Sequence, residues 1–151
     1  MTETVRIVTL LLLGLREALR MLREEGLPDV YARHSYLAEG VRAAVRAWDL
    51  PIFCKRPEEY SNTLTAVVMP EGADSGRLIE FAAGRLNLAL GVGLGKLKGR
   101  VFRIGHLGAL NELEVLATLA GVELALRAVG VPVALGSGVT ACQEHFARRL
   151  H

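Results

Sequence analysis

Cysteine is scarce in this sequence. Cys54 and Cys142 are the only two among 151 residues, and they form no CxxC pair. This spacing indicates neither a disulfide framework nor a zinc ribbon, and we interpret both as small buried hydrophobic residues. The four histidines include no pair with ligand spacing and a third ligand nearby, so we expect no metal site. A reducing cytoplasm is the expected location.

The sequence also lacks a charge excess and a long apolar run. Eighteen basic residues stand against sixteen acidic ones, a balance that does not favour nucleic acid or an anionic membrane as partner. The strongest apolar run, "IVTLLLLGL" at residues 7–15, has about half the length of a membrane span and continues into Arg16 and Glu17. No A-x-A-like cleavage signal follows it. We therefore expect a buried helix end, with no membrane partner.

The length and the hydrophobic content indicate one domain with a core, since 51% of the 151 residues are hydrophobic. A helix is predicted over residues 9–25, ended by Gly26, and Pro28 suits the first turn of a second helix. This second helix carries an apolar stripe at three- and four-residue steps. The stripe consists of Val30, His34, Leu37, Val41, Val45 and Trp48, and the opposite face carries Arg33, Glu39, Arg42 and Arg46.

After Pro51 the pattern alternates between strand and helix. "IFCK" and "NTLTAVVMP" are predicted strands, residues 70–86 a helix, and "LNLALGVGLG" and "RVFRIGHL" two further strands. A helix begins at Asn111, where Glu114 completes a capping-box pattern, and a last helix is predicted over residues 140–150. This order favours an α+β fold, with helices packed on a small, mainly antiparallel sheet.

The glycine-rich stretch at residues 91–108 raises the question of a phosphate loop. A Walker loop needs a glycine five residues before Gly95 and a Ser or Thr after Lys96, but Leu90 and Leu97 occupy these positions. The dinucleotide pattern fails as well, because the glycines lead into a strand rather than a helix. We therefore do not expect nucleotide binding.

Arg103 is the candidate binding residue within this stretch. In a strand it shares a face with Val101, Gly105 and Leu107, an apolar row in which an unpaired guanidinium is costly. The planar guanidinium matches a carboxylate best, and Gly105 leaves space beside it. Two interpretations stay open: an ion pair with a structural Asp or Glu, which spacing alone favours, and a site for a small carboxylate.

The other polar candidates have structural explanations. His106 is expected to be packed, and His34 to lie in the core or between helices. His145 and His151 accompany Arg148 and Arg149 on a predicted solvated face. Three basic residues of the glycine-rich loop are interpreted as keeping it soluble: Lys96, Lys98 and Arg100.

Three segments carry a family resemblance. "GLREALRMLREEGLPDVYARHSYLAEGVRAAVRAW", "EEYSNTLTAVVMPEG" and "GVGLGKLKGRVFRIGHLGALNELEVLATLAGVELAL" closely resemble the C-terminal region of class V, fold type I aminotransferases that depend on pyridoxal phosphate. The chain is most similar to the serine–glyoxylate and alanine–glyoxylate branch. The resemblance implies that Arg103 holds the substrate's α-carboxylate, with Gly93 and Gly105 as neighbours in the substrate pocket.

The same resemblance implies that a large cofactor domain is missing. In the family that domain carries pyridoxal phosphate and the Schiff-base lysine, and none of the three lysines here (Lys55, Lys96 and Lys98) matches that lysine. Glu3 and Arg6 stand where the family has polar residues that reach the cofactor phosphate. We therefore expect residues 1–151 to be a single small domain, residues 1–26 forming the helix that would link to the cofactor domain.

The expected partners follow from this. The chain alone should bind no pyridoxal phosphate and have no activity, and it should work with a cofactor-bearing domain in cis or in trans, as a homo-oligomer such as a dimer. Two alternatives remain: a free-standing module that binds small carboxylates, and a vestigial or structural domain that self-associates through Leu10–Leu13. Serine, alanine and related amino donors share one carboxylate clamp, so the donor stays open.

Overall fold

The computed structural model describes residues 3–149, which form two compact units that divide between Arg33 and His34. The first unit holds α1 (Glu3–Glu25) and the start of α2 (Leu27–Ala47), so the first helix begins six residues earlier than predicted. Gly26 separates the two helices with φ +85°, and its N–H donates to the Leu22 carbonyl at 3.0 Å. The predicted glycine stop is confirmed.

The surface of α1 is apolar in its first half and charged in its second. Eight large hydrophobic side chains are more than half exposed, namely Ile7, Val8, Leu10, Leu11, Leu12, Leu13, Leu15 and Leu19. Arg20 pairs with Glu17 and Glu24 in the last turns. The apolar run is therefore helical, as predicted, but it is not buried within its unit. No helix among residues 3–149 is long and apolar enough to cross a membrane.

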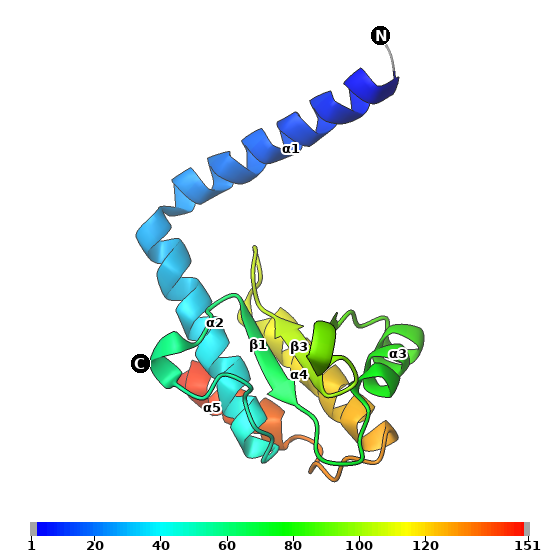
Figure 1. Cartoon of the computed structure of the whole chain (residues 1–151). Helices are drawn as coiled ribbons and strands as arrows, with labels where there is room; N and C mark the ends of the chain where they lie inside the picture. The colour runs from blue at the N-terminus through cyan, green and yellow to red at the C-terminus, as the bar shows by residue number, and fades with distance from the viewer. Residues whose placement is uncertain (1–2, 150–151) are drawn as a thin grey trace. The chain divides into compact units, whose positions relative to one another are not determined.

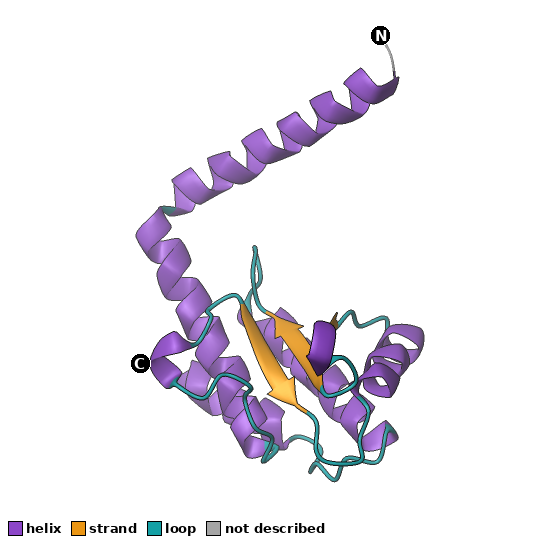
Figure 2. Ribbon diagram, viewed as in Figure 1, coloured by secondary structure: helices purple, strands orange, loops and turns teal. Residues whose placement is uncertain are grey.

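The second unit is built around a three-stranded antiparallel sheet in the order β1-β3-β2 (Figure 2). β1 (Leu64–Val68) and β2 (Gly91–Val92) flank the central strand β3 (Val101–Gly105). The α+β prediction is confirmed. The predicted strand "IFCK" is wrong, because only Ile52 forms an isolated bridge, with Val67.

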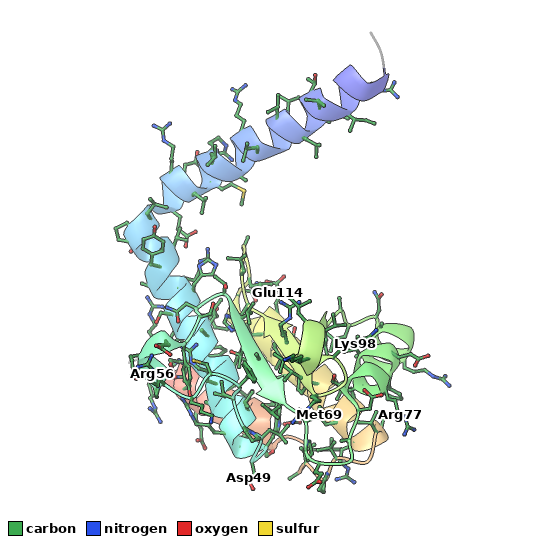
Figure 3. All side chains as sticks on the ribbon, in the orientation of Figure 1. Asp49, Arg56, Met69, Arg77, Lys98 and Glu114 are labelled. Atoms are coloured by element: carbon green, nitrogen blue, oxygen red, sulfur yellow. The ribbon has the colours of Figure 1, made fainter. Side chains whose placement is uncertain are left out.

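Three helices and two short 3₁₀ turns complete this unit. α3 (Ser75–Leu86) begins after Asp74, and α4 (Glu112–Ala128) begins with the predicted Asn111–Glu114 capping box, whose acidic member is labelled in Figure 3. α5 (Ser137–Ala147) begins three residues before the predicted start, after Gly136. The 3₁₀ turns are η1 (Pro57–Glu59) and η2 (Gly95–Leu97).

The core lies on one face of the sheet. Phe102 and Ile104 of β3 belong to one hydrophobic cluster with Leu37 of α2, Leu119 of α4 and Phe146 of α5, and α4 runs behind β3 in Figure 1. The predicted stripe of α2 is buried along its length from His34 to Trp48. Burial raises the pKa of the Cys142 thiol in this core to about 12.

Two polar side chains of this unit, those of Arg42 and His145, are more buried than their charge or polarity suggests. Arg42 is only 3% exposed, because its guanidinium binds Glu39, the Ser61 carbonyl at 3.1 Å and the Asn62 side chain at 3.3 Å. His145 is half-buried, and its Nε2 lies 3.0 Å from the Tyr36 carbonyl. The predicted solvated position of His145 was wrong, since its side chain binds the backbone of α2. His151 lies outside the described residues.

A buried carboxylate joins α4 to α5. Glu123 is 2% exposed and accepts hydrogen bonds from the Trp48 indole at 2.9 Å, from Gly136 N at 2.6 Å and from Gly138 N at 2.7 Å. The first N–H groups of a helix have no partner inside it, so Glu123 caps α5 from another helix. A Cβ on Gly138 would lie 2.4 Å from the Trp48 Nε1, which explains the glycine.

Candidate functional site

Arg103 occupies the middle of the central strand, between Ala66 of β1 and Gly91 of β2. The strand alternates as predicted, with Phe102 and Ile104 buried on the core face and Arg103 half-buried on the other. The predicted apolar row around Arg103 is only partly correct: Gly105 is exposed and Leu107 is 64% exposed. Arg103 therefore lies on the outer face of the sheet.

The Arg103 guanidinium has no acidic partner among residues 6–149, whose side chains the structure describes. Its Nε is buried without a hydrogen-bond partner, and none of the ion pairs within that range includes Arg103. A half-buried guanidinium without a partner is costly, so it calls for an explanation such as a ligand. The structural ion pair that spacing alone favoured is absent from the described part of the chain.

Gly91 provides the surface on which Arg103 lies. A Cβ at Gly91 would be 3.0 Å from both the Cβ and the Nε of Arg103 and 3.4 Å from its Cζ. The guanidinium therefore extends over the backbone of β2. Sequence reasoning missed Gly91, because its position opposite Arg103 follows only from the strand register.

The two glycines that were predicted as pocket neighbours differ in their surroundings. Gly93 is buried, and a Cβ there would lie 2.2 Å from the Leu97 carbonyl oxygen and 2.9 Å from that of Val101. Its absent side chain is thus explained by a close backbone approach within the β2–β3 turn. A Cβ at Gly105 would meet nothing within 4 Å, so space is open on the Arg103 strand there.

His106 anchors the end of the Arg103 strand in a buried network. Its Nδ1 lies 3.1 Å from the Asn62 carbonyl and its Nε2 lies 3.0 Å from the Thr65 hydroxyl. A carbonyl only accepts, so Nδ1 carries the proton and Nε2 accepts from Thr65. The pKa of His106 is lowered to about 4, mainly by burial, with a smaller contribution from the nearby charges of Arg42 and His34, while the hydrogen bond to the Asn62 carbonyl opposes the lowering. The prediction that His106 is packed is confirmed.

His34 and Cys54 complete the set of sequence candidates. His34 is buried and its Nε2 accepts from the Gly108 N–H at 3.1 Å, which confirms its expected core position. Cys54 is half-buried rather than buried, so only Cys142 fits the prediction of a buried hydrophobic residue. No group of three metal-ligating side chains occurs in the described range.

The pKa of His106 predicts a pH dependence of stability. Between pH 6.5 and pH 4 the unfolded chain takes up a proton at this residue and the folded chain does not, so acid destabilises the fold by up to about 1.4 kcal/mol per pH unit. Urea unfolding at several pH values should show a shallower loss for His106→Gln than for wild type. Equal slopes for His106→Gln and wild type would contradict the prediction.

Comparison with known proteins finds close relatives. No family model matches the chain. It is 53% identical over 136 residues to serine–glyoxylate aminotransferase of Methylorubrum extorquens, covering 90% of this chain and 34% of that protein. The Arabidopsis thaliana enzyme of the same name is 48% identical over 140 residues, 93% of this chain and 35% of the plant protein. The chain thus spans about a third of the length of the curated relatives it matches.

The fold is shared with a solved structure. Pyridoxamine–pyruvate aminotransferase from Mesorhizobium loti superimposes with a TM-score of 0.85 at 32% identity, covering 90% of this chain and 35% of that enzyme.

Proposed function

The chain corresponds to the C-terminal part of the serine–glyoxylate aminotransferase-like class V aminotransferases, and on this premise we propose that Arg103 binds the α-carboxylate of the amino acid and 2-oxo acid substrates. The half-buried guanidinium of Arg103, which has no acidic partner among residues 6–149, is the observation that carries this proposal. A guanidinium offers two parallel N–H groups to the two oxygens of a carboxylate. Gly93 and Gly105 are proposed as the neighbours of the bound substrate.

The role of Arg103 is orientation. Both substrates of a transaminase carry a carboxylate next to the reacting carbon, so one clamp serves the amino acid and the 2-oxo acid in turn. Holding the carboxylate at two points fixes the direction of the amino or carbonyl group and removes rotational freedom before the reaction. The strand position suits this role, because β3 is paired on both sides and its core face is buried.

The residues of this chain do not fit pyridoxal phosphate by themselves. A lysine that binds the cofactor needs an enclosed site, but Lys55, Lys96 and Lys98 are all exposed, and Lys98 lies on the loop between β2 and β3 (Figure 3). Arg6 is also exposed. We therefore propose that the cofactor and its lysine come from a further domain, in cis or in trans, and that the isolated chain is inactive.

A hybrid enzyme tests this proposal. The chain would replace the matching C-terminal third of the Methylorubrum extorquens relative, and both the hybrid and the isolated chain would be titrated with pyridoxal phosphate and assayed for serine–glyoxylate transamination. We expect a saturable absorbance band and turnover from the hybrid only. Turnover by the isolated chain would overturn the proposed dependence, and a hybrid that binds cofactor without turnover would overturn the proposed role.

The apolar half of α1 favours association of the isolated chain as a homo-oligomer, since soluble proteins rarely expose a contiguous apolar patch of this kind. Leu12→Asp removes a side chain that is 60% exposed and should lower the apparent mass in sedimentation equilibrium. Arg16→Gln, which lowers the net charge by the same one unit without removing apolar surface, should leave the mass unchanged. An unaltered oligomer in Leu12→Asp would contradict this prediction.

A further inference from the structure

The contact between Gly91 and Arg103 has no backbone explanation. Gly91 is not among the glycines with positive φ, so its main chain accepts any L-residue. The constraint is the arginine side chain, whose Nε would lie 3.0 Å from a Cβ at Gly91. A heavier residue here would have to displace the guanidinium or separate the two strands.

The same contact determines which of the three guanidinium nitrogen atoms of Arg103 are accessible to a ligand. Nε of Arg103 is buried, and a carboxylate oxygen, which is no smaller than water, has no access to it. Nη1 and Nη2 are not among the buried unpartnered atoms, and no hydrogen bond joins them to another described residue. At least part of each of these two nitrogen atoms is therefore exposed to solvent.

We propose that Gly91 is a positioning residue for Arg103. Its missing side chain lets the guanidinium lie flat across β2, which seals Nε and presents Nη1 and Nη2 end-on to a carboxylate. The identity of that carboxylate rests on the proposed function, whereas the position of the guanidinium does not. Gly91→Ala should move the guanidinium away from β2 and open Nε to solvent.

Hydrogen exchange of the arginine side chains tests the position of the guanidinium in the isolated chain. By NMR, the Nε–H of Arg103 should exchange at least about tenfold more slowly than that of exposed Arg100. Gly91→Ala should remove this protection. The matched control is Gly84→Ala in α3, where an added Cβ meets nothing within 4 Å. Fast exchange in wild type, or unchanged protection in Gly91→Ala, would overturn the proposal.

Kinetics of the hybrid enzyme test the consequence for binding. Gly91→Ala should raise KM for serine and for glyoxylate about tenfold or more while changing kcat much less, because a misplaced clamp weakens carboxylate binding. In an Arg103→Leu background the same substitution should have no further effect on KM. Independent, additive effects would contradict positioning through Arg103. If Arg103→Leu alone leaves KM unchanged, the proposed function fails, and the exchange measurement still decides the role of Gly91.

A folding control covers the case in which Gly91→Ala does not fold. Truncation to Arg103→Gly removes the Cβ, Nε and Cζ atoms that the new Cβ would meet. The double variant Gly91→Ala/Arg103→Gly should then recover the buried Trp48 fluorescence of the folded chain. A double variant as unfolded as Gly91→Ala would show that the glycine serves the strand rather than the arginine, and would overturn the proposal.

Discussion

Arg103→Leu should lower kcat/KM of the hybrid enzyme about 10²- to 10³-fold, through a raised KM for both serine and glyoxylate. Leucine keeps an apolar stem in the strand and removes all N–H donors, and losing one partner of a hydrogen-bonded charge pair costs roughly 2–5 kcal/mol. Arg103→Lys retains the charge but loses the pair of parallel N–H donors, so we expect kcat/KM to fall about tenfold. Steady-state kinetics with each substrate varied in turn measure these effects.

The control for this substitution is Arg100→Leu. Arg100 is an exposed arginine three residues earlier in the chain, and its backbone carbonyl, not its side chain, accepts a hydrogen bond from Met69 N. Arg100→Leu should leave both KM values unchanged. Equal losses in the two variants would point to the net charge of the loop rather than to a carboxylate clamp, and an active Arg103→Leu enzyme would refute the clamp.

Glu123→Ala should destabilise residues 34–151 by roughly 3–5 kcal/mol, the range found when a buried polar network loses a charged member. The substitution leaves the Trp48 indole and the backbone N–H groups of Gly136 and Gly138 without their acceptor. Nothing in the apolar surroundings replaces that acceptor. Urea unfolding followed by the fluorescence of Trp48, the only tryptophan, measures the loss.

Two variants separate capping from the mere loss of a charge. Glu123→Gln keeps one carbonyl oxygen for the indole but turns the other acceptor into a donor beside backbone N–H groups, so its stability should lie between that of Glu123→Ala and wild type. Glu144→Ala removes an exposed carboxylate from α5 and should change stability by less than about 0.5 kcal/mol. A small effect in Glu123→Ala would mean that α5 finds other acceptors.

The sequence predicts the parts of this fold that depend on local patterns. The stripe of α2, the glycine stop at Gly26 and the capping box at Asn111 need only neighbouring residues, and all three are confirmed. The same holds for the strand that carries Arg103, because its alternation lies within five residues.

Hydrogen-bond partners that lie far along the chain account for the features that the sequence did not reveal. Arg42 has the charge of a surface residue, but a loop twenty positions later supplies carbonyl and amide acceptors, so the side chain is buried. His145 binds a carbonyl of α2, more than a hundred positions earlier in the chain. The glycine beneath Arg103 was missed for the same reason: Gly91 is one glycine among several until the register of β2 on β3 is known. Long-range pairing has no local signature.

The contact between α2 and α5 has a consequence for synthesis on the ribosome. A Cβ at Gly40 would lie 2.6 Å from the Phe146 ring and 2.9 Å from the Cys142 sulfur, and the Tyr36 hydroxyl donates to the Phe146 carbonyl at 2.9 Å, across 110 positions. The apolar face of α2 is therefore synthesised about a hundred residues before the helix that covers it. A nascent chain should stay sensitive to protease until α5 has emerged, so a premature stop codon before Phe146 would leave an unfolded product that cellular proteases remove.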